Sequence, residues 1–158
     1  MNAKAKSNEP VRVVVSNRKA RHLYHLLETF QAGIVLLGTE IKALREGHAH
    51  LQDSYVMIER GEAFMIDSHI SEYSHKGYAV HDPRRPRKLL LHKREIARLF
   101  GKVQEKGLTM VPLRIYFVRG RAKVDVAVAR GKTLYDKRED IKNRDMERDL
   151  RQEMSHRR

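Results

Sequence analysis

Cysteine is absent from this chain of 158 residues. Disulfide bonds, a cysteine nucleophile and a zinc site built from thiolates are therefore excluded. The absence is compatible with a reducing compartment, and we expect the protein in the cytoplasm.

Long apolar runs are missing as well. No stretch approaches the roughly 20 apolar residues that span a bilayer. Residues 1–10 contain neither the apolar segment of a signal peptide nor a lipidation motif. We expect these ten residues to form a flexible extension.

Motifs of catalytic and nucleotide-binding sites are not found either. The chain has no G-x-x-x-x-G-K-[ST] loop, no G-x-G-x-x-G turn and no G-x-S-x-G elbow. Nine histidines are present, but the pairs His22 with His25 and His48 with His50 have no clear third ligand nearby. A catalytic zinc ion usually needs three protein ligands. We therefore expect surface histidines, no metal, no cofactor and no enzymatic activity.

Positive charge is abundant. Lysine and arginine total 33 against 20 acidic residues, which gives a formal net charge of +13. This surplus exceeds what solubility requires and favours binding of a polyanion. Nucleic acid is the commonest such partner, and an anionic membrane is the weaker alternative. Several acidic residues are scattered among basic ones, where we expect solvated surface pairs: Glu40, Glu46, Asp53, Glu59, Glu62 and Asp67.

Apolar spacing in the first third of the chain predicts alternating strands and helices. The β-branched run 11–17 is typical of a strand, and Asn17 can cap a following helix. Apolar residues at helical spacing predict that this helix covers 18–33, with Gly33 at its end. A short buried strand is predicted at 34–38.

Further along the chain, glycine turns and helical stripes predict a mainly β domain. Thr39 is expected to cap a short helix, and Ile96, Leu99, Phe100 and Val103 form the apolar stripe of another. In the second hairpin, the valines of 123–128 are predicted to face the core and the residues between them, Ala127 included, to face water. The remaining expectations are hairpins at 54–67 (turn Arg60-Gly61) and 108–130 (turn Arg119-Gly120), helices at 40–47 and 92–107, an ambiguous stretch at 68–80 and a loop at 81–88.

The predicted elements favour an antiparallel β-barrel related to the oligonucleotide-binding fold, formed by 11–130 and flanked by two to three α-helices. The loop run HDPRRPRK (81–88) is either a nucleic-acid contact or a solvated segment. Residues 131–158 contain dense charge of both signs and few apolar anchors. This tail is either a solvated polyampholyte or a segment that folds on binding. We expect it to be disordered when free and helical when docked.

Seven runs, in chain order, resemble the small protein B family, whose members bind transfer-messenger RNA (tmRNA) during bacterial ribosome rescue. The resemblance implies a barrel related to the oligonucleotide-binding fold that holds the tRNA-like domain of tmRNA. It further implies delivery of tmRNA to stalled ribosomes for trans-translation, with the tail sensing the empty mRNA channel at the decoding centre. The runs are NRKARHLY (17–24), GTEIKALREG (38–47), DSY (53–55), RKLLLHKREI (87–96), GLTMVPLRIYF (107–117), KVDVAVARGK (123–132) and YDKREDIKNRD (135–145).

The resemblance also implies which residues contact RNA. The expected tmRNA-binding residues are Arg18, Lys19, Arg21, His22, His92, Lys93, Lys123, Arg130 and Lys132. The expected ribosome-contacting residues of the tail are Tyr135, Asp136, Lys137, Arg138, Ile141, Lys142, Arg144 and Met146. The chain departs from the family pattern at three positions: Gln31, Thr133 and Asn143.

Two other functions have to be weighed against ribosome rescue. One is a translation factor that uses a similar barrel on another RNA, although such a protein would not need the run YDKREDIK after its last strand. The other is an RNA-modifying or RNA-cleaving enzyme, which turnover of structured RNA with a divalent metal would reveal. A monomer is expected because no coiled-coil seam is present.

Overall fold

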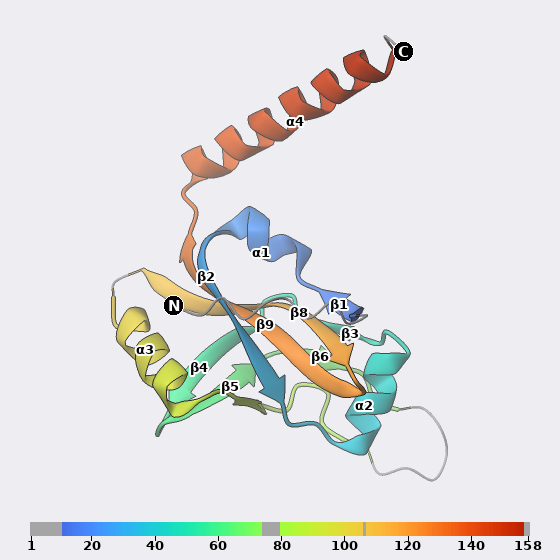
Figure 1. Cartoon of the computed structure of the whole chain (residues 1–158), viewed down its shortest axis with the longest axis vertical. Coiled ribbons are helices and arrows are strands. Elements are labelled where there is room, and N and C mark those ends of the chain that lie inside the picture. The colour runs from blue at the N-terminus through green and yellow to red at the C-terminus, as the bar shows by residue number, and fades with distance from the viewer. Residues whose placement is uncertain (1–10, 74–79, 106, 157–158) are drawn as a thin grey trace.

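The computed structural model describes residues 11–73, 80–105 and 107–156 (Figure 1). Residues 1–10, the predicted extension, lie outside this description. Strands dominate the first 131 residues, and a long helix follows them. The elements are β1 (Arg12–Ser16), α1 (Arg18–Leu23), β2 (Tyr24–Ile34), α2 (Gly38–Arg45), β3 (Ala49–His50), β4 (Tyr55–Glu59), β5 (Glu62–Ile66), β6 (His69–Ile70), β7 (Arg87–Leu90), α3 (Lys93–Val103), β8 (Leu108–Val118), β9 (Arg121–Gly131) and α4 (Leu134–His156).

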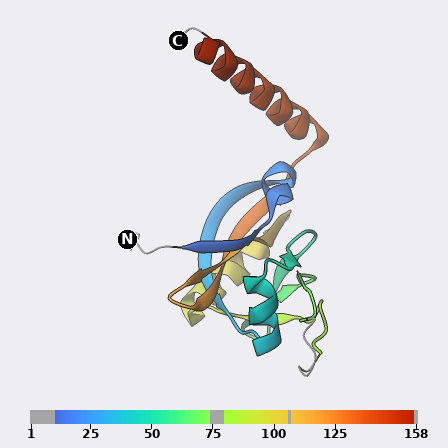
Figure 2. The same ribbon diagram turned by 90° about the vertical axis from the view of Figure 1, so that its right-hand side faces the viewer.

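Seven strands form one antiparallel sheet in the order β1-β8-β4-β5-β7-β2-β9. Because β9 also pairs with β8, the six strands from β8 to β9 close into a ring (Figures 1 and 2). β3 and β6 form a separate two-stranded sheet. The predicted mainly antiparallel β class is confirmed, whereas the relation to the oligonucleotide-binding fold stays a prediction.

Both predicted hairpins are confirmed, and the backbone conformation of their turns favours hairpin formation. β4 and β5 pair up to Glu59 and Glu62, which leaves Arg60-Gly61 as a two-residue turn with φ of 50° and 75°. β8 and β9 are joined in the same way by Arg119-Gly120, with φ of 50° and 73°. Two consecutive positive φ values are the signature of the tight turn whose twist matches antiparallel strands.

The predicted helix over 18–33 is wrong beyond Leu23. From Tyr24 the chain is strand β2, which pairs with β9 from Tyr24 to Gly33. Residues on alternate positions of β2 face the interior, and Leu27 between them is 53% exposed. The helical spacing of apolar residues in this segment was thus coincidental. The predicted strand over 34–38 is also wrong, since Ile34 ends β2 and α2 begins at Gly38.

Other boundaries differ for local reasons. Thr39 does not cap α2, because the helix starts one residue earlier and the carboxylate of Glu40 accepts from the amide of Leu37 (3.0 Å). The side chain of Thr39 instead lies 2.9 Å from Nδ1 of His81. The predicted loop 81–88 ends early, because β7 begins at Arg87. In the ambiguous stretch, His69–Ile70 is strand β6, and residues 74–79 lie outside the described part of the chain.

The core lies inside the ring, with α2 and α3 covering it. The alternating valines of β9, Val124, Val126 and Val128, are buried there as predicted. Ala127 was predicted to face water, but it is buried in a second small cluster with Ala20 of α1. β9 is therefore covered on both faces near its middle.

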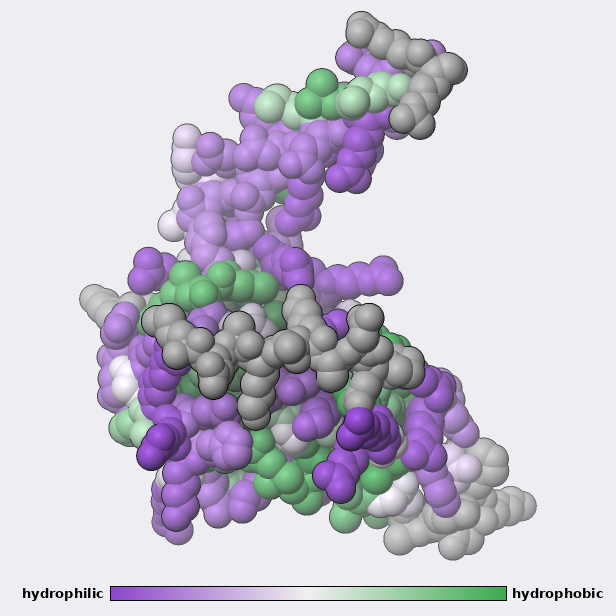
Figure 3. All heavy atoms as spheres, in the orientation of Figure 1, coloured by the Kyte–Doolittle hydropathy of each residue, from purple (hydrophilic) through white to green (hydrophobic). Residues whose placement is uncertain are grey.

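α4 stands away from the ring as one continuous helix (Figures 1 and 2). None of its residues is buried, and its surface is mostly hydrophilic (Figure 3). Of the four helices in the described chain, α1, α2 and α3 belong to the predicted set of two to three beside the ring, and α4 is the tail. The predicted disorder of the free tail is not confirmed. Within the described residues, no helix is long and apolar enough to cross a bilayer.

Candidate RNA-binding surface

α1 presents basic side chains on a rigid base. The Asn17 side chain accepts from the amide of Ala20 (3.3 Å) and donates to the carbonyls of Leu51 (3.3 Å) and Pro112 (3.0 Å). These bonds fix the start of the short helix against neighbouring segments. The predicted contacts Arg18, Lys19 and Arg21 are exposed, and His22 is half-buried.

Arginines from three elements meet beside α1. A cavity of about 410 Å³ is lined by Arg18 and Arg21 of α1, Arg114 of β8 and Arg144 of α4. Arg114 is neutralised by Asp125 (2.7 Å), whereas the other three pair with no acidic side chain in the described ranges. The fold therefore concentrates uncompensated positive charge between the ring and α4, which suits a phosphate backbone.

Lys132 does not present a free charge. Its Nζ donates to the carbonyl of Arg21 (2.8 Å) and ion-pairs with Asp140 of α4, and its side chain is 7% exposed. Its amide donates to the carbonyl of Leu23 (2.8 Å). Lys132 was predicted to bind tmRNA, but the structure places it in a junction that joins α1, β9 and α4.

A second pair of contacts completes this junction. Asp136 Oδ2 lies 3.3 Å from Nε2 of His25. Thr133 and Asp136 exchange side-chain-to-amide hydrogen bonds at the start of α4, both 3.2 Å long. The Thr133 hydroxyl, then His25, lower the pKa of Asp136, and Lys132 lowers the pKa of Asp140. Asp136, predicted to contact the ribosome, thus also orients the helix that carries it.

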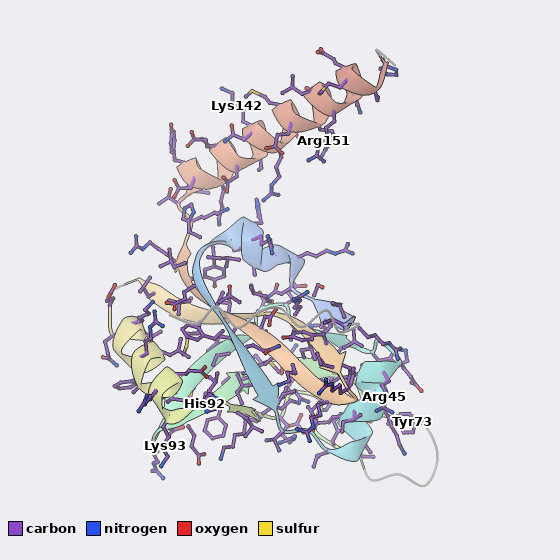
Figure 4. The ribbon with its side chains drawn as sticks, in the orientation of Figure 1. Arg45, Tyr73, His92, Lys93, Lys142 and Arg151 are labelled. Atoms are coloured by element: carbon purple, nitrogen blue, oxygen red, sulfur yellow. The ribbon has the colours of Figure 1, made fainter. Side chains whose placement is uncertain are left out.

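The remaining predicted tmRNA-binding residues lie in two places. Arg130 is exposed and opposite His25 in the β2–β9 register, so it belongs with the α1 group. His92 and Lys123 line a different cavity of about 540 Å³, together with Gln31. Lys93 follows His92 at the start of α3 (Figure 4). The nine residues are therefore divided between the α1 side and the α3 side of the ring.

Gln31 belongs to a hydrogen-bonded network on the α3 side. Its Nε2 donates to the hydroxyl of Tyr116, which donates to Asp125 (2.8 Å). Burial raises the pKa of Tyr116, and the interaction with Asp125 acts in the same direction although Gln31 opposes it. The phenol therefore stays a neutral donor, and the network fixes Gln31 at the cavity wall.

Two arginines of the basic run 81–88 face inward. Arg87 is fully buried and pairs with the fully buried Glu40. It also donates to the carbonyls of Ser68 (2.8 Å) and Pro83 (3.0 Å). Arg85 pairs with Glu40 as well. The predictions that Glu40 forms a solvated pair and that this run is all surface loop are therefore wrong.

The charges of this buried group compensate one another. Burial alone would raise the pKa of Glu40, but hydrogen bonds from Arg85, the amide of Leu37 and Arg87 outweigh it and lower that pKa. Glu40 is therefore ionised and ties α2 to β7. Nothing in the local sequence indicated this contact, because its partners lie more than forty residues apart.

The histidines that the structure describes form no ligand set. The rings of His50 and His69 stack with centroids 4.7 Å apart, and burial, followed by the charges of His50 and two arginines, lowers the pKa of His69. In the part of the chain that the structure describes, no three His, Asp or Glu residues lie close enough to hold a metal ion.

The predicted ribosome-contacting residues all lie on α4. Tyr135 is 73% exposed, and Lys142 points away from the ring (Figure 4). Asp136 and Lys137 are half-buried near the junction, while five others are exposed: Arg138, Ile141, Lys142, Arg144 and Met146. α4 therefore presents basic side chains and isolated apolar side chains along its exposed length.

Comparison with known proteins agrees with the resemblance noted in the sequence. The family model described as SmpB protein matches residues 14–156. The SsrA-binding protein of Desulforudis audaxviator is 54% identical over 144 residues, covering 91% of this chain and 94% of that protein. The SsrA-binding protein of Microcystis aeruginosa is 50% identical over 151 residues, covering 95% and 98%.

A solved structure is also similar. It is described as "tmRNA-SmpB: a journey to the center of the bacterial ribosome" and matches with a TM-score of 0.65 and 51% identity. The match covers 80% of this chain and 92% of the solved chain. With the family model matching nearly the whole described chain and relatives identical at half of their positions, the chain belongs to the SmpB protein family.

Proposed function

We propose that this protein is a non-catalytic, cytoplasmic RNA-binding protein that binds the tRNA-like domain of tmRNA and delivers it to stalled ribosomes for trans-translation. The observation that carries the proposal is the division of accessible basic side chains into two separate groups. The α1 group includes Arg18, Lys19 and Arg21, and the α3 group includes His92, Lys93 and Lys123. Two separate basic groups allow one protein to contact both tmRNA and ribosomal RNA.

The α3 group is the proposed tmRNA side. Its cavity combines two basic side chains, His92 and Lys123, with a polar amide on Gln31 and the half-buried Leu91. RNA loops expose unpaired bases and phosphates together, and such a mixed surface suits both. In this proposal the β ring serves as a barrel of the oligonucleotide-binding type.

The resemblance alone implies that the α1 group binds tmRNA. We instead propose it, together with α4, as the ribosome side, because Arg18 and Arg21 line one cavity with Arg144 of α4. Arg18, Arg21 and Arg144 would neutralise ribosomal RNA phosphates, and the exposed ring of Tyr135 would stack on a nucleotide of the decoding centre. α4 would lie in the mRNA channel only when no message fills it. A message in the channel would exclude the helix sterically and electrostatically, so docking of α4 would indicate that the channel is empty.

A monomer with a tail that orders on docking fits this role. α4 buries no residue, and helices in proteins gain most of their stability from tertiary packing. We propose that residues 131–158 are disordered in the free protein and helical on the ribosome. The ribosome would then supply the packing surface that the ring does not.

The test is a binding titration of the full chain against the isolated tRNA-like domain of tmRNA. Ordinary tRNA and random duplex RNA serve as competitors, and each titration is repeated at several salt concentrations. The expected result is a preference for the tRNA-like domain that persists near physiological salt. Equal affinity for all three RNAs that vanishes as salt rises would mean that only net charge is recognised, and would overturn the proposal.

A further inference from the structure

A groove of about 670 Å³ lies between α3 and the β4–β5 turn. Its walls come from α3 and from the β4–β5 hairpin, which are neighbours in Figure 1. The lining residues are Ile58, Arg60, Gly61, Glu62, Lys93, Ile96, Ala97 and Phe100. We propose that this groove receives an unstacked base of the tRNA-like domain, an inference that rests on the proposed function and adds a base-binding site to it.

Phe100 contributes an exposed aromatic ring to the lining of the groove. Phe100 belongs to the predicted apolar stripe of α3, and it is 49% exposed. Ile58 and Ile96 beside it are half-buried, so the ring stands in an apolar setting with one side open. Aromatic side chains on such surfaces stack on unpaired bases without regard to base identity.

The rim of the groove is positively charged. Arg60 is held in the tight β4–β5 turn, and Lys93 begins α3. Neither forms an ion pair within the described residues. The acid that lines the groove, Glu62, is compensated by Nζ of Lys88 at 3.1 Å. Two free cations beside an open ring match a nucleotide, which presents a base and a phosphate together.

The groove lies next to the proposed tmRNA side. The first turn of α3 separates the two hollows: Lys93 and Ile96 line the groove, whereas His92 and Glu95 line the cavity that also contains Lys123. A single RNA loop can therefore contact both at once. This proximity to the proposed tmRNA side favours RNA over a protein segment as the occupant.

The experiment measures affinity of full-length variants for the tRNA-like domain of tmRNA. Phe100→Ala removes the ring, and Phe100→Leu removes it while keeping an apolar side chain. Arg60→Asn removes a rim cation, and asparagine tolerates the positive φ at that position. The matched controls are Leu27→Ala, at an apolar residue of similar exposure, and Arg121→Gln, at an exposed cation beside the other hairpin turn.

We expect both Phe100 variants to weaken binding by about tenfold, because a leucine cannot stack as a ring does. Arg60→Asn should weaken binding about threefold and reduce the slope of log affinity against log salt by about one. The controls should stay within twofold of the unmodified protein. Thermal melts followed by circular dichroism establish that each variant is folded.

Three outcomes would overturn the groove as a base-binding site. Full affinity in all three groove variants would mean that RNA does not enter it, as for a groove that binds a protein partner. Full affinity in Phe100→Leu with loss in Phe100→Ala would mean apolar packing without base stacking. Failure of the unmodified protein to bind the tRNA-like domain would overturn the proposed function as well, so the two failures are distinguishable.

Discussion

The ring and α4 contain the same charged residue types but use them differently. Arg87 of the ring and Glu40 of α2, which covers the ring, are both fully buried and bind each other. On α4 no residue is buried, and Arg148 and Asp145 are 3.8 Å apart on the exposed surface. A buried pair defines one arrangement of the segments that it joins, whereas exposed pairs contribute little to stability. The ring therefore has a fixed shape of its own, and α4 leaves its charges available to a partner.

Removing α4 tests whether the two regions have separate functions. A chain that ends after Lys132 keeps the contacts of Lys132 with the backbone of α1. We expect its affinity for the tRNA-like domain to change less than threefold, while peptide tagging on stalled ribosomes is lost. Both are measured with the same preparation, in a titration and in a reconstituted translation reaction. Tagging at the unmodified rate would contradict the role proposed for α4.

Breaking the buried ion pair should have the largest effect on the ring's stability. Arg87→Met leaves the carboxylate of Glu40 without its fully buried partner, and breaking such pairs costs about 3–5 kcal/mol. The free energy of unfolding is measured by urea denaturation. Lys88→Gln, which breaks the exposed pair with Glu62, is the matched control and should cost less than about 1 kcal/mol. Equal losses of unfolding free energy in the two variants would show that burial of the Arg87–Glu40 pair does not increase its contribution to stability.

The lack of buried residues on α4 also predicts how this segment behaves as an isolated peptide. A peptide of residues 131–158 has no packing surface, and isolated helices of moderate length are marginal in water. We expect its circular dichroism in buffer to show little helix at 25 °C. Hydrogen exchange in the full chain should likewise be fast along α4 and slow in β8 and β9. A peptide that is mostly helical would contradict ordering on docking.

The sequence was sufficient to predict an element where the structure of that element depends on residues adjacent to it in the chain. The turns Arg60-Gly61 and Arg119-Gly120 carry their own backbone preference, so both hairpins were predictable. β2 was assigned to a helix because the pairing that defines it comes from β9, about a hundred residues later. Alternating exposure along 24–34 is visible only once that partner is known.

The candidate site likewise contains residues that the local sequence identifies and residues whose role depends on distant partners. Charge and family resemblance identify the exposed cations of α1 without a structure, because exposure is the ordinary state of arginine and lysine. They do not identify Lys132 as a junction residue, because its environment depends on Asp140 and on the backbone of α1. They also place Phe100 in the apolar stripe of α3, but helical spacing does not tell which residues of such a stripe stay exposed.

The smallest expected effect concerns the junction between the two regions. Hydrogen bonds from Thr133 and His25 lower the pKa of Asp136, and the bond from Lys132 lowers that of Asp140. Because both are lowered from 3.8, their contribution to holding α4 is complete above pH 3.8 and is lost as pH falls through the folded-state values. Lys132→Met should return the pKa of Asp140 toward 3.8 and leave Asp136 nearly unchanged. Carboxyl chemical shifts followed by NMR against pH measure both groups in one experiment. An unshifted Asp140 in the unmodified protein would mean that Lys132 does not hold the start of α4, and the orientation of the tail would then depend on His25 and Thr133 alone.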